Sequence, residues 1–192
     1  MDSFEHVVAA ILERKGYWTR TCVKVALEPE EKRAIGRASS PRWELDVVGY
    51  QGRDNRLLVL ECKSFLDSYG VRTATFAGRK AKDEKRYKLF FEHTLREVVL
   101  GRLVKQLIGS RFCAPNPKLS FGLAAGKIHG DEAWLREHFV KQNWELWTPT
   151  MIRTELAGLR DSKYENSVAS VVAKLLLRGT VDSEDAADDA SD

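Results

Sequence analysis

Three charged side chains fall within two apolar segments, at places where a buried strand normally carries none. Asp46 lies in segment 43–50, and Glu61 and Lys63 lie in segment 57–63. Burying such groups without a partner is costly. A divalent cation such as Mg²⁺ is a suitable partner, because it takes one or two carboxylates and keeps several waters. The three side chains together therefore predict a metal site with a lysine beside it.

A metal ion held in this way implies hydrolytic chemistry on a phosphoryl group. Such an ion generates a nucleophilic water at neutral pH and stabilises negative charge on a phosphoryl oxygen. Lys63 would hold the attacking water or the developing charge. The alternative is that Asp46 and Glu61 lie at strand ends and point into solvent. For Asp46 alone that alternative is the stronger one, but the three residues together favour the functional interpretation.

The two segments are expected to form a β-hairpin that positions these side chains. A polar break, Q-G-R-D-N-R, separates two apolar runs rich in aliphatic residues. Alternate residues of a strand share a face, so Glu61 and Lys63 point the same way. If the strands pair antiparallel, Asp46 and Glu61 converge on one spot. Cys62 then points to the other face, and we expect it to be a small apolar core residue.

These residues resemble the PD-(D/E)xK nuclease superfamily, whose members share the restriction-endonuclease-like fold. In that family an Asp on the second core strand and a Glu-x-Lys on the third bind the metal and activate water, which corresponds here to Asp46, Glu61 and Lys63. The sequence departs from the family name because Leu45, not Pro, precedes Asp46. The wide spacing, with residues 47–60 between the two carboxylates, is a common variation in the family.

The resemblance covers residues 1 to about 65 and implies further features of the site. Glu5, on the first helix, matches the additional Glu of archaeal Holliday-junction resolvases and Mrr-like restriction enzymes. Asp46, Glu61 and the backbone carbonyl of Cys62 would hold Mg²⁺, with Mn²⁺ able to substitute, and Glu5 would support that metal or a second one. Without the resemblance, Glu5 is better interpreted as a first-turn acid that complements the helix dipole.

The resemblance also implies an architecture and an oligomeric state. The expected fold is a three-layer α/β/α core of the restriction-endonuclease-like type, with a mixed β-sheet flanked by helices. Resolvases and restriction enzymes are usually dimers, and a twofold homodimer would place two sites on two strands.

The composition indicates one globular domain, over residues 1–179. The chain is 43% hydrophobic and 31% charged, and no uncharged apolar run approaches the eighteen or so residues that a membrane span needs. The first residues, M-D-S-F-E-H, lack the basic flank and apolar stretch of a signal peptide, so a cytoplasmic location is expected. The three cysteines are widely spaced without a C-x-x-C motif, which predicts neither disulfides nor a zinc site.

The net charge of +3 conceals an uneven distribution. Residues 180–192 hold six of the 28 acidic residues and no Lys or Arg, so residues 1–179 carry a net charge of +9. A basic body favours a polyanionic partner such as a nucleic acid. We expect the acidic tail to be disordered. A weaker alternative is that the tail mimics nucleic acid and competes for the basic face.

Positive charge is densest directly after the carboxylate motif. Segment 71–88 has seven basic residues against two acidic ones, which is typical of a surface that holds a phosphodiester backbone. Two more arginines flank the turn before Asp46. The alternative for all of them is an ordinary solvated surface. The predicted nucleic-acid contacts are Arg72, Arg79, Lys80, Lys82, Lys85, Arg86, Arg37 and Arg42.

The remaining elements follow from apolar periodicity and from Gly and Pro positions. Ser3 is expected to cap the first helix, and Trp18 to point inward from a first strand. Gln106 is expected at the surface, with a role at the active centre as the weaker alternative. The expected helices are 3–15, a short one from Pro29, 81–111 with a break near His93 or Gly101, one from Gly130, 149–160, and an amphipathic 165–178; the other strands are 17–27, 119–126 and 145–147.

The sequence thus predicts a metal-dependent nuclease that hydrolyses phosphodiester bonds, with DNA as the expected substrate and endonucleolytic action of a restriction, repair or recombination type. No separate DNA-reading domain fits in this length, so we expect structure-specific or weakly sequence-specific action, or recruitment by another protein. The alternative is a non-catalytic DNA-binding or assembly module that keeps the fold and needs a partner for activity. An intact E-x-K motif argues against that alternative.

Overall fold

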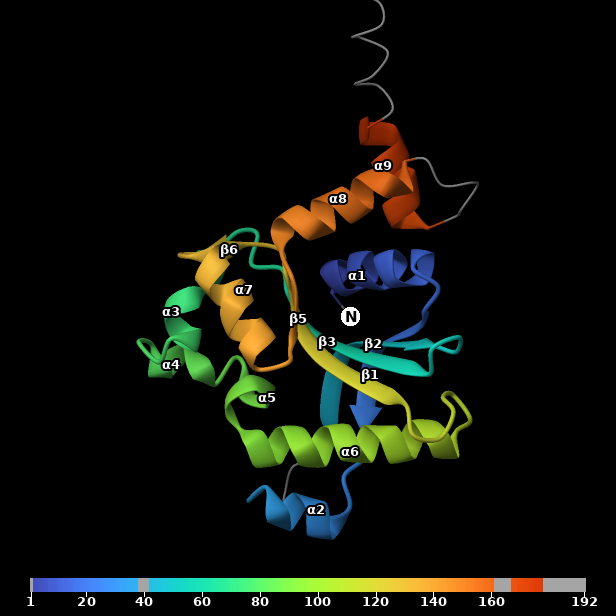
Figure 1. Ribbon diagram of the computed structural model, residues 1–192, viewed down its shortest axis with the longest axis vertical. Coiled ribbons are helices and arrows are strands. Elements are labelled where there is room, and N and C mark those ends of the chain that lie inside the picture. Colours follow the sequence, from blue (N-terminus) through green and yellow to red (C-terminus); the bar gives the residue numbers. More distant parts are fainter. Residues whose placement is uncertain (1, 38–41, 161–166, 178–192) are drawn as a thin grey trace, which may run out of the picture.

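The computed structural model describes residues 2–37, 42–160 and 167–177, and shows an α/β protein built on one five-stranded mixed sheet. The order of strands in that sheet is β1-β2-β3-β5-β7. The predicted α/β class with a mixed sheet and flanking helices is confirmed (Figure 1). The strands are β1 (Trp18–Val25), β2 (Trp43–Gln51), β3 (Arg56–Lys63), β5 (Lys118–Ala125) and β7 (Glu145–Trp147).

The predicted hairpin is the antiparallel pair β2 and β3. Its register runs from Gln51 opposite Arg56 to Val47 opposite Leu60, and β1 pairs antiparallel with the other edge of β2. Asn55, in the turn, has a φ of 46°, a left-handed conformation that Asn tolerates better than most residues. β5 and β7 continue the sheet in parallel, and a second, two-stranded sheet pairs β4 (Val71–Arg72) with β6 (Ile128–His129).

Helices cover both faces of the sheet (Figure 1). Along β3, Leu58 and Leu60 belong to the core beneath α1, while Leu57 and Val59 belong to the core against α6, as alternation along a strand requires. One layer contains α1 (Ser3–Arg14), α8 (Pro149–Leu159) and α9 (Val168–Leu177). The other contains α3 (Thr73–Phe76), α5 (Lys88–Phe91), α6 (His93–Gly109) and α7 (Glu132–Lys141), with α4 (Ala81–Glu84) beside α3 and α2 (Pro29–Ala34) beyond α6.

The long helix predicted for residues 81–111 is divided into α4, α5 and α6. Glu92 is extended, with φ −98° and ψ 91°, so the last break falls next to His93, one of the two predicted places, and not at Gly101. The aromatic cluster explains the break. Phe90 packs on Phe121 at a ring-centroid distance of 4.6 Å and on Phe76 at 5.7 Å, and the chain turns around these contacts.

Two smaller predictions at the start of the chain are wrong. Asp2, and not Ser3, is the N-cap of α1, because its side chain accepts a hydrogen bond from the amide of Phe4 at 3.1 Å. Trp18 is 70% exposed instead of pointing inward, since it begins an edge strand where little of the chain covers it.

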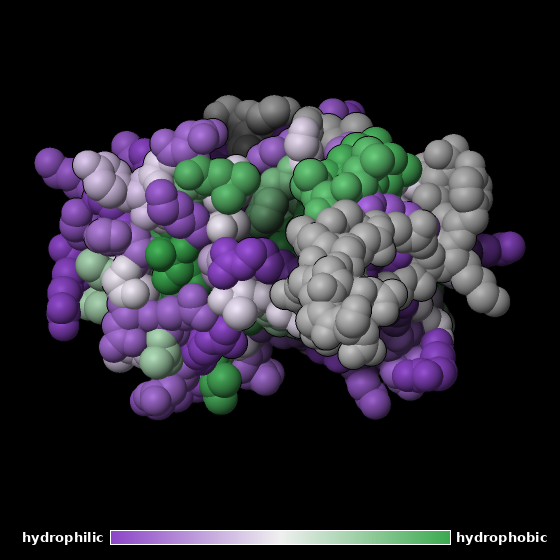
Figure 2. Space-filling model, turned by 90° about the horizontal axis from the view of Figure 1, so that it is seen from above, coloured by the Kyte–Doolittle hydropathy of each residue, from purple (hydrophilic) through white to green (hydrophobic). Residues whose placement is uncertain are grey.

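Helix α9 presents its apolar face to solvent. The apolar side chains that the sequence groups on one face of this helix are exposed, whereas the small residues Ser170 and Ala173 are buried. Figure 2 shows the resulting apolar patch in green. The exposed side chains are Val168, Val171, Val172, Leu175 and Leu176. The acidic residues 180–192 lie outside the described residues.

No helix within the described ranges is both long enough and apolar enough to cross a bilayer.

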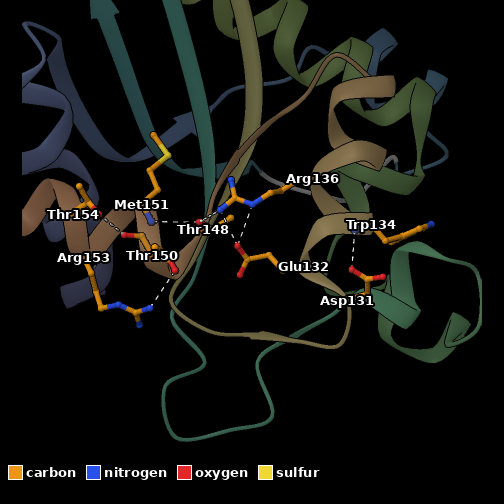
Figure 3. A network of polar contacts seen from close by, with 9 residues as sticks. All are labelled: Asp131, Glu132, Trp134, Arg136, Thr148, Thr150, Met151, Arg153 and Thr154. Carbon is orange, nitrogen blue, oxygen red and sulfur yellow. Dashed lines mark hydrogen bonds and ion pairs between the residues drawn. The ribbon is translucent and has the colours of Figure 1, made fainter.

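A polar network joins α7 to the start of α8 at the end of β7 (Figure 3). Arg136 donates hydrogen bonds to Glu132 at 2.8 Å and to the hydroxyl of Thr148 at 2.7 Å. The same hydroxyl accepts from the amide of Met151 at 3.3 Å and so caps α8. Because Thr148 is fully buried, the network fixes the two helices relative to the sheet.

We expect Thr148→Ala to lower the free energy of unfolding by about 1–2 kcal/mol, because α8 loses its cap and Arg136 loses an acceptor. Thr154→Ala, on the exposed side of the same helix, is the matched control and should change it by less than about 0.5 kcal/mol. Urea denaturation of both variants measures the difference. Equal stability of the two variants would contradict this role for Thr148.

Candidate functional site

The candidate site lies where β2 and β3 part. Their pairing ends at Val47 opposite Leu60, so Asp46 and Glu61 are the next residues in register, while β3 stays paired with β5 as far as Lys63 opposite Ala125. Asp46 closes the gap with its side chain, since its Oδ2 accepts a hydrogen bond from the amide of Cys62 at 2.7 Å. The divergence therefore brings two carboxylates to one place at the sheet.

Lys63 lies between the two carboxylates. Its Nζ is 3.7 Å from Oδ2 of Asp46 and 3.6 Å from Oε2 of Glu61, and it donates a hydrogen bond to the carbonyl of Cys62 at 3.1 Å. All three charged side chains are mostly shielded, with exposed fractions of 22% for Asp46, 14% for Glu61 and 20% for Lys63. The structure thus brings together the three residues that the sequence singled out.

Negative charge exceeds positive charge at this point. The pKa of Glu61 is raised from its ordinary 4.5 to about 7, chiefly by burial and also by the charges of Asp46 and Glu5, against the opposing effect of Lys63. A single ammonium therefore does not balance the carboxylates around it. A divalent cation at this place would relieve the imbalance.

Gly126 helps to hold the backbone at Lys63. It follows β5, and its amide donates a hydrogen bond to the carbonyl of Lys63 at 2.9 Å. A Cβ atom at this position would lie 2.5 Å from the carbonyl oxygen of Ser64, which is closer than such contacts allow. Only glycine lets the two chains approach this closely just after the lysine.

Cys62 packs as the sequence predicts. Its side chain is buried and belongs to the apolar core beneath α1, on the face opposite Glu61 and Lys63. Burial raises the pKa of its thiol well above the ordinary value, so the thiol stays protonated. Its backbone contributes two hydrogen bonds to the site instead: the amide donates to Asp46, and the carbonyl accepts from Lys63.

Glu5 lies next to this group but engages a different partner. It is buried in the first turn of α1, and its Oε2 accepts a hydrogen bond from Sγ of Cys22 at 3.3 Å. Cys22 stands opposite Asp46 in the β1/β2 register, where pairing is interrupted, and has a φ of 52°. A left-handed conformation is costly for a non-glycine residue within a strand, and strained residues of this kind cluster at functional sites. Cys22 was not singled out from the sequence, which carries no signal for a backbone angle.

The donor set suits a hard cation with few protein ligands. Within the residues that the structure describes, no three His, Cys, Asp or Glu side chains are grouped to hold one ion. Asp46 and Glu61 supply two carboxylates, and the Cys62 carbonyl supplies a third oxygen on the same side as Lys63. Mg²⁺ is commonly held by one or two carboxylates with several waters, so these residues fit it. The placement of Glu5 as a direct ligand stays a prediction.

Of the basic residues predicted to contact nucleic acid, two form ion pairs within the protein and the others are exposed. Arg72 pairs with Asp83 at 3.6 Å. Arg37 is held by both oxygens of Glu92, at 2.8 and 2.7 Å, beside α6. The others are exposed at the surface, and their contact with a nucleic acid stays a prediction: Arg42, Arg79, Lys80, Lys82, Lys85 and Arg86.

Arg136 is a cation at this edge of the sheet that the sequence did not reveal. Lys63 on β3 pairs with Ala125 on β5, and the preceding residue, Ala124, pairs with Trp147 on β7. Thr148, which follows Trp147 and binds Arg136, therefore lies two strands away from Lys63. The backbones at these two positions are about 10 Å apart. Its side chain is 48% exposed. The sequence around it reads as an ordinary amphipathic helix and gives no sign of this position.

Gln106 does not reach the carboxylates. Its side chain donates to the carbonyl of Lys24 at 3.0 Å and accepts from the amide of Ala26 at 3.2 Å. It therefore satisfies the backbone at the end of the edge strand β1. The surface interpretation was the better one.

Comparisons with known proteins assign no family. No protein-family model matches the sequence, and no curated protein matches it. Among solved structures, the chain is similar to the crystal structure of a protein of unknown function, AF1548, with a TM-score of 0.38 and 15% identity over 90% of this chain and 77% of that one.

We expect Glu61→Gln to stabilise the metal-free protein above pH 7. A folded-state pKa of about 7 against an ordinary 4.5 means that the folded protein binds more protons between these values, so its stability falls as pH rises through this window. The loss is on the order of 3 kcal/mol, and the neutral amide avoids it. Thermal unfolding in EDTA at pH 8 should show a higher Tm for the variant, and the gain should shrink toward pH 4.5.

Glu97→Gln is the matched control, because Glu97 is exposed on α6 with 67% of its side chain accessible. It should leave the Tm unchanged at either pH. A Glu61→Gln variant that is less stable than the natural protein at pH 8 would contradict the charge imbalance at the site.

Proposed function

We propose that the protein is a metal-dependent nuclease that hydrolyses phosphodiester bonds, with DNA as its expected substrate. The observation that carries the proposal is the position of Lys63 between Asp46 and Glu61, at the point where β2 and β3 part. Two carboxylates facing one lysine combine the ligands for a hard cation with a hydrogen-bond donor that can orient an attacking water or stabilise charge on a phosphoryl oxygen.

Asp46, Glu61 and the carbonyl of Cys62 would hold the Mg²⁺ ion, which when bound lowers the pKa of water and stabilises charge on a phosphoryl oxygen. The residues of the chain do the rest. Asp46 is oriented by the amide of Cys62, so its carboxylate is fixed before any ligand arrives. Lys63 has three N–H donors and already lies among oxygen acceptors, which suits it to orient a water or to contact the phosphate.

The charge of the surrounding surface supports a polyanionic substrate. The exposed basic residues of segment 71–88 follow the carboxylates along the chain. Arg136 adds a half-exposed guanidinium two strands from Lys63. Such cations offset the repulsion between a phosphodiester backbone and a carboxylate site, and they make binding weaken as salt rises.

The second candidate is a nucleic-acid-binding module that does not cleave. The same exposed basic residues favour it, because they would bind a phosphate backbone whether or not the carboxylates act. The two candidates differ in one respect only, namely the dependence of cleavage on Lys63 and on a metal.

We expect Lys63→Gln to reduce Mg²⁺-dependent cleavage by about 100- to 1000-fold, because loss of a preorganised donor at the reacting group costs about that much. The assay uses supercoiled plasmid, linear duplex, single-stranded DNA, a branched junction and RNA, each with Mg²⁺, Mn²⁺ or EDTA. Lys118→Gln is the matched control, since Lys118 is exposed at the other end of the sheet, opposite Arg56. It should cleave like the natural protein.

A second readout separates lost chemistry from lost binding. Lys63→Gln leaves both carboxylates in place, so Mn²⁺ should still raise its Tm and its affinity for DNA should stay within about twofold. Cleavage that survives in Lys63→Gln would remove the catalytic role. If the natural protein cleaves none of the five substrates but binds DNA, the second candidate takes precedence.

A further inference from the structure

A pocket of about 270 Å³ lies beyond the carboxyl end of β3, between the loop 64–70 and the start of α3. The loop runs directly from Lys63 to this pocket, so the two places are at most about 25 Å apart along an extended chain. Nothing in the nuclease chemistry proposed above uses the pocket. The residues that line it are Ser68, Tyr69, Gly70, Arg72, Thr75, Asp83, Arg86 and Tyr87.

Thr75 supplies a buried polar group that has no partner. Its residue is fully buried, and its hydroxyl makes no hydrogen bond within the described chain. Among the described residues, no other buried side-chain nitrogen or oxygen lacks a hydrogen-bond partner. A buried hydroxyl without a partner is costly, and folded proteins satisfy nearly all such groups. Because Thr75 lines the pocket, a bound ligand with a donor or acceptor would satisfy it.

Tyr69 supplies an exposed aromatic ring at the same pocket. The residue is 69% exposed, although large aromatic side chains are usually better covered. The guanidinium of Arg72 lies over the ring, 4.9 Å from its centroid, and is itself paired with Asp83 at 3.6 Å. The ring is thus held by a cation that is anchored in turn, while most of its surface stays open to a planar group.

The pocket carries net positive charge. Arg72 and Arg86 line it against the single carboxylate of Asp83, and Arg86 is exposed. Four further exposed basic residues, Arg79, Lys80, Lys82 and Lys85, lie along the chain between these two arginines. An aromatic ring, an unsatisfied hydroxyl and an available guanidinium are the three groups that recognise a nucleotide, through its base face, its base edge and its phosphate.

We propose that this pocket holds one unpaired nucleotide of the nucleic acid. Its base stacks on Tyr69, its polar edge meets the hydroxyl of Thr75, and its phosphate contacts Arg86. A base within an intact duplex has no free face to stack on Tyr69, so the pocket selects a strand that is single, frayed or flapped. The inference rests on the proposed function for its substrate class, and it deepens that function by naming an unpaired strand as the part of the nucleic acid that the protein holds.

The test measures binding in EDTA, where no cleavage occurs. Fluorescein-labelled single-stranded and duplex DNA of equal length are titrated with the natural protein and with Tyr69→Ala. Stacking on one aromatic ring is worth roughly 5- to 150-fold in affinity. Tyr69→Ala should weaken single-strand binding by that much and change duplex binding by less than about twofold. Trp18→Ala is the matched control, since Trp18 is 70% exposed on β1, and it should alter neither.

Thr75→Val tests the hydroxyl that has no partner, because valine has nearly the same shape as threonine but no hydroxyl group. Removing a buried group that lacks a partner should leave the Tm equal or higher, while single-strand affinity falls several-fold. Stability and binding then move in opposite directions, which damage to the fold would not produce. Competition completes the test: deoxyadenosine monophosphate should displace the labelled single strand at concentrations at which inorganic phosphate does not.

Several results would overturn the proposal. One is that the natural protein binds no single-stranded DNA. Another is that Tyr69→Ala binds like the natural protein, or loses affinity for duplex and single strand equally. A third is that inorganic phosphate competes as well as the nucleotide does. The outcome is separable from that of the nuclease proposal. Loss of single-strand binding in Tyr69→Ala with no cleavage of any substrate supports the pocket alone, whereas Lys63-dependent cleavage with unchanged Tyr69→Ala binding supports the nuclease alone.

Discussion

The placement of Lys63 between two shielded carboxylates is the interaction on which the rest of the structure depends. Asp46 and Glu61 are the next residues in register where the pairing of β2 with β3 ends, and β3 stays paired with β5 beyond this point. One ammonium offsets part of their charge, and the pKa of Glu61 stays raised, chiefly because the side chain is buried and also because Asp46 and Glu5 lie near it. The apolar layers on both faces hold this unfavourable arrangement in place, so the free energy of folding supports a cluster of shielded charges.

Much of this site could be predicted from the sequence, because strand alternation is a local property. Two apolar runs with a polar break predict a hairpin, and the parity of Glu61 and Lys63 puts them on one face, away from Cys62. The point at which β2 and β3 stop pairing could not be predicted. The left-handed backbone at Cys22 accompanies the gap in the β1/β2 register, and the Cys62 amide bonds to the side chain of Asp46, and neither leaves a pattern in residue types.

Features that depend on packing between distant elements were also hidden. The periodicity of residues 81–111 predicts one helix, but the contacts of Phe90 with Phe76 and Phe121 break it. Arg136 reaches the edge of the sheet only because α7 packs beside the end of β7 and Thr148 accepts from it. The α9 pattern correctly indicates an amphipathic helix, yet it cannot tell which side faces the protein, and here the small residues do.

The most direct test of a metal centre at Asp46 and Glu61 is the anomalous scattering of Mn²⁺ in crystals of the protein. The expected result is one peak within coordination distance of both carboxylates and of the Cys62 carbonyl, with Lys63 displaced from between them, and no such peak in crystals of Asp46→Asn. Mn²⁺ bound elsewhere, or an ammonium still seated between the two carboxylates at saturating metal, would contradict the assignment of these residues as a catalytic metal site.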